Sequence, residues 1–267
     1  MRTRIATGGV CALALLVAVG CNLPGKPKAG PEVPRPEDVM AFDKLYGDNC
    51  AGCHGVDGRN GSATNLANPK YQAWIDDATL RDVIAKGENH PSDKDQSPGA
   101  PEKESLMPAF ALESGGVLTD QQIDALVKGM RERWRHGDPF GGEKPPPYRA
   151  SHAGDPGKGK AVYAIACGRC HGMTREQPGK AGTILDGSFL ALVNEQTIRT
   201  TIVPGRPDIG EPDWRGHIPG RAMTDDEVMD VTAWLMMQKP VLPGQPYPNR
   251  NQLSGKPGDE PPSAIKK

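Results

Sequence analysis

The sequence contains one five-residue pattern twice, and this pattern constrains the fold more than any other feature of the chain. Residues 50–54 read Cys-Ala-Gly-Cys-His, and residues 167–171, 117 positions later, read Cys-Gly-Arg-Cys-His. In each copy two thiols stand three positions apart and an imidazole follows directly. A run of this kind places three reactive side chains on a single turn of backbone, so each copy predicts a site for a bound group.

The similarity between the two halves extends beyond this pattern. Residues 77–81 (Asp-Ala-Thr-Leu-Arg) correspond to residues 195–199 (Glu-Gln-Thr-Ile-Arg), which lie 118 positions later. Residues 119–123 (Thr-Asp-Gln-Gln-Ile) correspond to residues 224–228 (Thr-Asp-Asp-Glu-Val), which lie only 105 positions later. We interpret the two halves as copies of one module. Because the offset shrinks, the first copy is expected to carry an extra loop, around residues 90–103.

Both modules are predicted to be helical. Apolar residues recur at helical spacing before each Cys-x-x-Cys pair, and a middle helix fits between this pair and the end of each module. Those four helical segments are residues 36–49, 78–86, 155–166 and 196–203. The last helix of each module is expected to follow an N-cap threonine, Thr119 or Thr224. No segment alternates apolar and polar residues for long, so the predicted fold class is all-α, with three or four short helices per module.

Three kinds of site use a Cys-x-x-Cys pair, and the histidine that follows each pair distinguishes them. A structural zinc ion needs four ligands at each site. A redox-active disulfide does not require a histidine at the same offset in both copies. Cys-x-x-Cys-His is the attachment pattern of c-type haem, in which the thiols bond the vinyl groups of the porphyrin and the histidine binds the iron. We therefore predict two covalently bound haem c groups with iron, attached at Cys50, Cys53 and His54 and at Cys167, Cys170 and His171.

The composition agrees with small modules that surround a large apolar cofactor. Apolar residues make up 36% and aromatic residues 5% of the 267 residues, which is low for a single large core. Glycine (33 residues) and proline (27 residues) are abundant, which indicates loop-rich modules and extended connections. The chain has 32 basic and 33 acidic residues and no basic stripe, so nucleic acid is not expected as a partner.

The first twenty residues are typical of an export signal. Arg2 and Arg4 precede an apolar run, residues 10–19, that is shorter than the roughly 20 residues needed to cross a bilayer. Residues 18–21 (Ala-Val-Gly-Cys) resemble a bacterial lipobox, in which cleavage before the cysteine leaves Cys21 to carry lipid. Plain secretion and an uncleaved anchor are the alternatives. We expect a periplasmic, extracytoplasmic protein that is anchored to the membrane as a lipoprotein through Cys21.

The sequence predicts six consecutive parts, of which three are rich in proline or glycine. These parts are a signal peptide (1–20), a flexible tether (21–35), a first domain (36–137), a linker (138–153), a second domain (154–240) and a disordered tail (241–267). The composition of the linker leads us to expect that the two domains are separate folding units.

Each half resembles a class I cytochrome c domain, and the whole chain resembles bacterial dihaem cytochrome c lipoproteins. The resemblance implies two tandem small helical domains, each wrapped around a covalent haem. Such domains take the sixth iron ligand from a methionine in the loop before the last helix, and residues 107–110 (Met-Pro-Ala-Phe) fit this pattern. Met107 is therefore the expected second metal ligand beside His54, and filling a gap in the core is its alternative role. The family often orients the haem histidine through a proline carbonyl; Thr64 and Gly182 stand near that place here, and their carbonyls can serve instead.

The second module departs from the family pattern in the same loop. When the last helices are aligned, residues 211–214 (Glu-Pro-Asp-Trp) match the Met-Pro-Ala-Phe loop, so a glutamate stands where the methionine is expected. Met223 aligns with Leu118, a position typical of an apolar residue that packs before a helix cap. His217 follows Glu211 by six residues in the same loop. The sequence leaves Glu211, His217, Met223 and the absence of a protein ligand as alternatives at the second iron.

These features predict an electron carrier rather than an enzyme. Its expected partners are redox proteins, namely a membrane or periplasmic oxidase, reductase or dehydrogenase complex. Modules this small leave little room for a substrate pocket. The alternative is a haem enzyme or enzyme subunit whose open second iron performs peroxidase-like or nitrogen-oxide chemistry, with His217 or Glu211 as the distal acid–base group. A ligand sensor is a third class, for which the sequence offers no output domain.

Overall fold

The structure, a computed structural model of the chain, describes residues 30, 33–88 and 107–239. The predicted signal peptide, the lipidation site Cys21, most of the tether, the extra loop and the tail all lie outside these residues. The chain divides into two units, Met1–Asp38 and Val39–Lys267.

The described part of the first unit contains the 3-10 helix η2 (Pro36–Asp38). The guanidinium of Arg35 lies 2.9 Å from the carboxylate of Asp38 at its end. Both side chains are well exposed to solvent, so this pair adds little stability.

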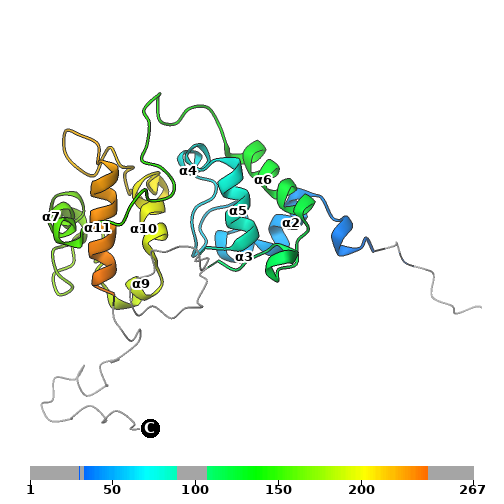
Figure 1. Cartoon of the computed structure of the whole chain (residues 1–267), viewed down its shortest axis with the longest axis horizontal. Helices are drawn as coiled ribbons and strands as arrows, with labels where there is room; N and C mark the ends of the chain where they lie inside the picture. The colour runs from blue at the N-terminus through cyan, green and yellow to red at the C-terminus, as the bar shows by residue number, and fades with distance from the viewer. Residues whose placement is uncertain (1–29, 31–32, 89–106, 240–267) are drawn as a thin grey trace, which may run out of the picture. The chain divides into compact units, whose positions relative to one another are not determined.

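The first module is the earlier part of the second unit. Its helices are α2 (Phe42–Asn49), α3 (Ala51–His54), α4 (Pro69–Trp74), α5 (Asp77–Lys86), η3 (Leu112–Ser114) and α6 (Asp120–Trp134) (Figure 1). Helix α6 begins with a capping box, because Thr119 and Gln122 each bond the backbone of the other. One face of α6 is fully buried and packs against Tyr46 of α2 in a single core cluster. Gly129 makes this crossing close, since a Cβ there would lie 2.2 Å from the Phe42 ring.

The second module repeats this arrangement. Its helices are α7 (Pro156–Ala166), α8 (Gly168–His171), α9 (Gly187–Ala191), α10 (Glu195–Ile202), η4 (Pro207–Ile209) and α11 (Asp225–Met237). Helices α7 and α11 lie side by side (Figure 1). Gly159 permits their contact, because a Cβ there would lie 1.9 Å from the carbonyl oxygen of Asp230. Thr224 and Glu227 form the second capping box, at the start of α11.

The predicted all-α fold class is confirmed, because the described residues form helices and isolated β-bridges but no strand. The first predicted helix is too long: α2 begins at Phe42, since Ala41 has an extended backbone and supplies no cap. The pattern analysis missed α4 and α9, which are too short to show a period. A local sequence signal for each helix is its N-cap residue, Asn68 for α4 and Asp186 for α9. The side chain of each accepts a hydrogen bond from a backbone N–H of the first turn.

The predicted linker, residues 138–153, which we call the strap, is mostly exposed but buries Phe140, Pro146 and Tyr148. Phe140 is 5% exposed and belongs to the core of the second module. Tyr148 is 8% exposed and belongs to the core of the first module. Its ring centroid lies 4.9 Å from that of Trp74, and Arg199 donates to its carbonyl oxygen at 3.1 Å. Both modules and the strap lie in one compact unit, Val39–Lys267.

Candidate haem-binding sites

The two Cys-x-x-Cys-His turns have nearly the same backbone geometry. Cys50 breaks the helix with φ −117° and ψ −35°, and Cys167 does so with φ −115° and ψ −41°. Each turn ends at a glycine with positive φ, 80° at Gly55 and 84° at Gly172, a conformation that favours glycine. The duplication that the sequence indicates is thus repeated in the folded chain.

None of the four cysteines in these turns forms a disulfide bond. Cys50 and Cys167 are buried, whereas Cys53 is exposed and Cys170 is partly exposed. Burial is the main reason why the pKa of both Cys50 and Cys167 is raised to about 12, with a smaller contribution from neighbouring acidic groups. One buried and one accessible thiol on the same turn fit two thioether bonds to a porphyrin held against the apolar core.

Each haem histidine is oriented by a backbone carbonyl. Nδ1 of His54 donates to the carbonyl of Thr64 at 2.8 Å, and Nδ1 of His171 donates to the carbonyl of Gly182 at 3.0 Å. The predicted carbonyl support at Thr64 and Gly182 is confirmed. Because Nδ1 is engaged, Nε2 is the nitrogen left to bind iron. Burial also lowers the pKa of His54, which favours the neutral imidazole that a metal requires.

Two tyrosines that the sequence analysis missed hold these turns closed. The hydroxyl of Tyr46 donates to the carbonyl of Gly55 at 2.8 Å, and that of Tyr163 donates to the carbonyl of Gly172 at the same distance. Both tyrosines stand four residues before the first cysteine of their turn. That shared position is the signal by which the sequence could have revealed them.

In both modules the loop before the last helix forms backbone hydrogen bonds with the segment that follows the middle helix. In the first module the backbone N–H of Glu88 donates to the carbonyl of Met107 at 3.1 Å. In the second module Arg206 and Glu211 exchange two backbone hydrogen bonds, each 3.0 Å long. Met107 and Glu211 are therefore structurally equivalent, as the alignment of the last helices predicted.

Met223 occupies a different place in this loop. Its N–H donates to the carbonyl of Trp214 at 2.8 Å, just as the N–H of Leu118 donates to the carbonyl of Phe110 at 2.8 Å. Its side chain is 3% exposed and belongs to the core cluster of the second module. Met223 thus takes the part of an apolar core residue, equivalent to Leu118.

Three polar residues gather at the second site. Glu211 lies between two histidines: Oε2 is 3.5 Å from Nε2 of His171, and Oε1 is 3.7 Å from Nδ1 of His217. The side chain of His217 is 3% exposed, and that of Glu211 is 22% exposed. Burial acts to raise the pKa of Glu211, but the hydrogen bond with His171 and the charges of both histidines outweigh it and lower the pKa. The carboxylate is therefore ionised at neutral pH.

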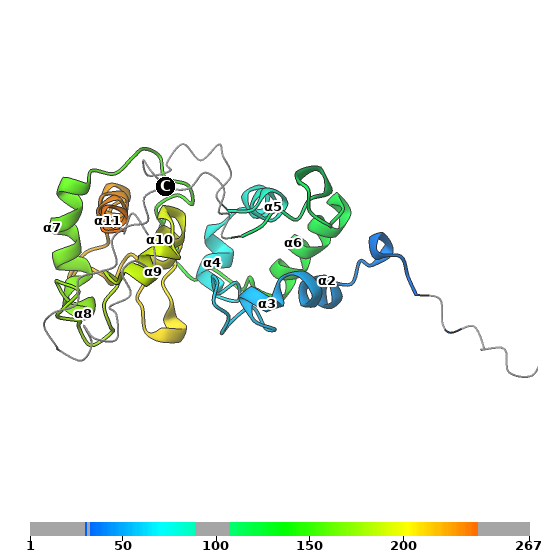
Figure 2. The same cartoon turned by 90° about the horizontal axis from the view of Figure 1, so that it is seen from below.

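Two side chains at the start of α4, in the first module, contact the loop that carries Glu211 in the second module. These contacts, Asn68 with Gly205 and Lys70 with Asp213, are called the clasp. Helix α4 lies on the side of the first module that faces α9 and α10 (Figure 2). Asn68, its N-cap residue, donates its side-chain amide to the carbonyl of Gly205 at 2.9 Å. Lys70 forms an ion pair with Asp213, whose side chain is 7% exposed and also pairs with Arg215 at 2.7 Å. Burial acts to raise the pKa of Asp213, but its hydrogen bonds with Arg215 and Lys70 outweigh it and lower the pKa to about 2.

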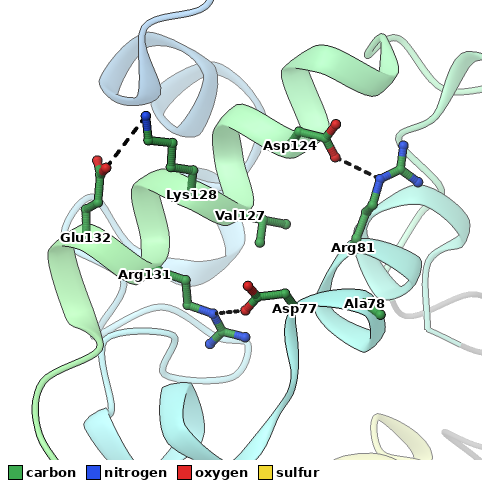
Figure 3. Close-up of a pocket in the computed structure, with 8 residues that line it drawn as sticks. All are labelled: Asp77, Ala78, Arg81, Asp124, Val127, Lys128, Arg131 and Glu132. Carbon is green, nitrogen blue, oxygen red and sulfur yellow. Dashed lines mark hydrogen bonds and ion pairs between the residues drawn. The ribbon is translucent and has the colours of Figure 1, made fainter.

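A surface groove lies between α5 and α6 (Figure 3). It is lined by Asp77, Ala78, Arg81, Asp124, Val127, Lys128, Arg131 and Glu132. Its charges pair with one another: Arg81 with Asp124 and Arg131 with Asp77, both at 2.8 Å. None of the predicted haem residues lines it, and we assign it no role.

Comparisons with known proteins agree with this geometry. A family model described as cytochrome c matches residues 42–134, and one described as cytochrome C oxidase, cbb3-type, subunit III, matches residues 154–235. A curated relative, the Cbb3-type cytochrome c oxidase subunit CcoP of Azospirillum sp. (strain B510), is 27% identical over 201 residues. That alignment covers 70% of this chain and 61% of the relative, so the chain matches about three fifths of that protein's length.

A solved structure, the reducing HAO-like protein complex of Kuenenia stuttgartiensis, is 17% identical and has a TM-score of 0.37. The alignment covers 80% of this chain and 100% of the other, but a TM-score this low supports no argument. Within the described ranges, no helix of this chain is long and apolar enough to cross a membrane.

The two family matches each contain one of the attachment turns. Two cytochrome c domains imply two covalently bound haem c groups with their iron. The expected class is confirmed: the chain is a dihaem c-type cytochrome built from two cytochrome c domains.

Proposed function

We propose that this cytochrome carries single electrons between extracytoplasmic redox proteins, one of which is a membrane-bound oxidase, reductase or dehydrogenase complex. The observation that supports this best is the pair of Cys-x-x-Cys-His turns, each with its histidine held by a carbonyl, in one compact unit. The family description of the second domain and the relative's printed name both refer to an oxidase subunit, which favours such a complex as the partner.

The residues proposed to hold the haems are those that the sequence singled out. Cys50 and Cys53 attach the first porphyrin, and Cys167 and Cys170 attach the second. His54 and His171 bind the irons through Nε2. Met107 is the proposed sixth ligand of the first iron; methionine with histidine raises the reduction potential and closes the iron to outside ligands, as an electron carrier requires.

A redox titration of the purified, haem-loaded protein tests the carrier function. We expect two haems per chain that resist extraction with acid acetone, and two one-electron steps that are each reversible. Reduced protein should pass its electrons rapidly to a membrane oxidase or reductase preparation. A single haem per chain, zinc in place of iron, or irreversible oxidation would contradict the proposal.

A second candidate function, a haem enzyme, is favoured by one observation. Glu211 lies 3.5 Å from Nε2 of His171, where the iron would bind, and His217 lies 3.7 Å from the same carboxylate; a carboxylate and an imidazole so placed can move protons. Steady-state turnover with hydrogen peroxide or nitrite distinguishes the two functions. Sustained turnover would replace the carrier proposal, whereas electron exchange without turnover supports it.

We further propose that lipid on Cys21 anchors the chain to the membrane. Cys21→Ser should move the protein from the membrane fraction to the soluble fraction, because the acyl chains supply the attachment. Haem content should stay unchanged, since attachment of haem uses other cysteines. Cys11→Ser, inside the predicted signal peptide, is the matched control and should leave the protein membrane-bound. Continued membrane association of Cys21→Ser would show that another segment or a partner holds the protein.

A further inference from the structure

We propose that the carboxylate of Glu211 is the sixth ligand of the second haem iron, with the buried His217 beside its other oxygen. The inference rests on haem attachment at Cys167, Cys170 and His171, and not on which proteins exchange electrons with the chain. With this ligand, the two modules would bind their irons through different sixth ligands.

The first argument is position in the fold. Glu211 makes the backbone pairing with Arg206 that Met107 makes with Glu88 in the first module. In a duplicated module, equivalent positions face equivalent parts of the bound group. If Met107 faces the first iron, the side chain of Glu211 faces the second.

The second argument is distance. Oε2 of Glu211 lies 3.5 Å from Nε2 of His171, the nitrogen that iron would take. Nitrogen and oxygen ligands each lie about 2.0–2.2 Å from a transition metal, so two ligands on opposite sides of one are about 4 Å apart. The observed separation is therefore about 0.5–0.9 Å shorter than that between two opposite ligands, so a small outward movement of the Glu211 side chain would make room for the iron.

The third argument excludes the other candidates. Nδ1 of His217 lies 3.7 Å from Oε1 of Glu211, the oxygen that does not face His171, and its Nε2 lies 3.4 Å from the carbonyl of Ile202. Both ring nitrogens are therefore directed at other partners, and His217 stands behind the carboxylate. The side chain of Met223 is used in the core, where it replaces Leu118.

Charge also favours this assignment. Glu211 is largely shielded from solvent, and a shielded carboxylate is costly unless a positive charge is close to it. A ferric porphyrin carries a net positive charge on the iron, which would compensate the carboxylate. Because an anionic oxygen ligand stabilises ferric over ferrous iron, the second haem should have the lower reduction potential.

The test uses the haem-loaded full chain with Glu211→Gln, which keeps the size of the side chain and removes its charge. In the wild type we expect slow binding of cyanide to the second ferric haem, because Glu211 must first leave the iron. Glu211→Gln should bind cyanide at least tenfold faster and should raise the lower of the two potentials. The sulfur-to-iron charge-transfer band of the first haem should be unchanged, which shows that the variant is folded.

Two further variants make the result specific. Glu211→Met should create a second sulfur-to-iron band, because the thioether then stands opposite His171. Asp208→Asn is the matched control: it removes a carboxylate from the same loop, where Asp208 pairs with Arg206 at 2.7 Å, and should leave the cyanide rate unchanged.

Two outcomes would overturn the proposal. If Glu211→Gln has the ferric spectrum and cyanide rate of the wild type, Glu211 does not bind the iron. If His217→Gln alone changes that spectrum, His217 is the ligand. Neither outcome contradicts the proposed carrier function, because the redox titration of the wild-type protein tests that function separately.

Discussion

Single residues decide how each iron behaves, although the two modules share their attachment turns. A carbonyl bond fixes each haem histidine in the same way, at Thr64 for His54 and at Gly182 for His171. The proposed difference is the sixth ligand, which is the thioether of Met107 in the first module and the carboxylate of Glu211 in the second. Axial ligands set haem potentials over a range of about 0.8 V, so one such exchange separates two otherwise equivalent haems.

Met107→Ala tests the thioether in the first module. The sulfur-to-iron charge-transfer band of the ferric protein should disappear, and the higher potential should fall by on the order of 0.1 V, a modest part of the range that axial ligands span. Spectra and a redox titration measure both effects.

Met223→Leu is the control for this variant, because it makes the second module match Leu118 of the first. It should leave the band and both potentials unaltered. Survival of the band in Met107→Ala, or its loss in Met223→Leu, would mean that a different methionine binds iron.

At the scale of elements, α4 of the first module holds the loop that carries Glu211 in the second. Asn68 bonds Gly205, and Lys70 bonds Asp213, two residues beyond Glu211. The pKa of Asp213 is about 2 in the folded chain and near 3.9 when unfolded, so the clasp is intact at neutral pH. Its contribution to stability is present above about pH 4 and is lost as the pH falls through about 2.

Lys70→Met should therefore change the second haem although the mutation lies in the first module. We expect a loss of about 1.5–3 kcal/mol in the free energy of unfolding, typical of a hydrogen bond between charged groups. The cyanide rate of the second haem should rise, and the band of the first haem should stay. Urea unfolding and stopped-flow spectra measure these effects.

Lys44→Met is the matched control for the clasp. Lys44 pairs with Asp48 at 2.8 Å on the surface, where both side chains are more than half exposed, so its loss should cost almost nothing. A second haem that is unaffected by Lys70→Met would show that the loop keeps its conformation without α4.

At the scale of the whole molecule, local patterns predicted the modules, and long-range contacts escaped prediction. The duplicated turns, the capped last helices and the match of Glu211 with Met107 all depend on residues close together in the sequence. The clasp joins Lys70 to Asp213 across 143 positions, which no pattern within one module reveals. The prolines and glycines of the strap indicate a spacer, and its contacts through Phe140 and Tyr148 with the two cores follow from no local pattern.

The strap also limits how this protein can be divided or recombined. Phe140 comes first in the chain but packs in the core of the second module, and Tyr148 comes later but packs in the core of the first. A break between these two residues deprives both halves of an aromatic anchor, and a break on either side deprives one of them. No single crossover point therefore yields two complete domains, so a gene encoding either half alone would have to include the strap up to that half's own anchor, Tyr148 for the first module and Phe140 for the second.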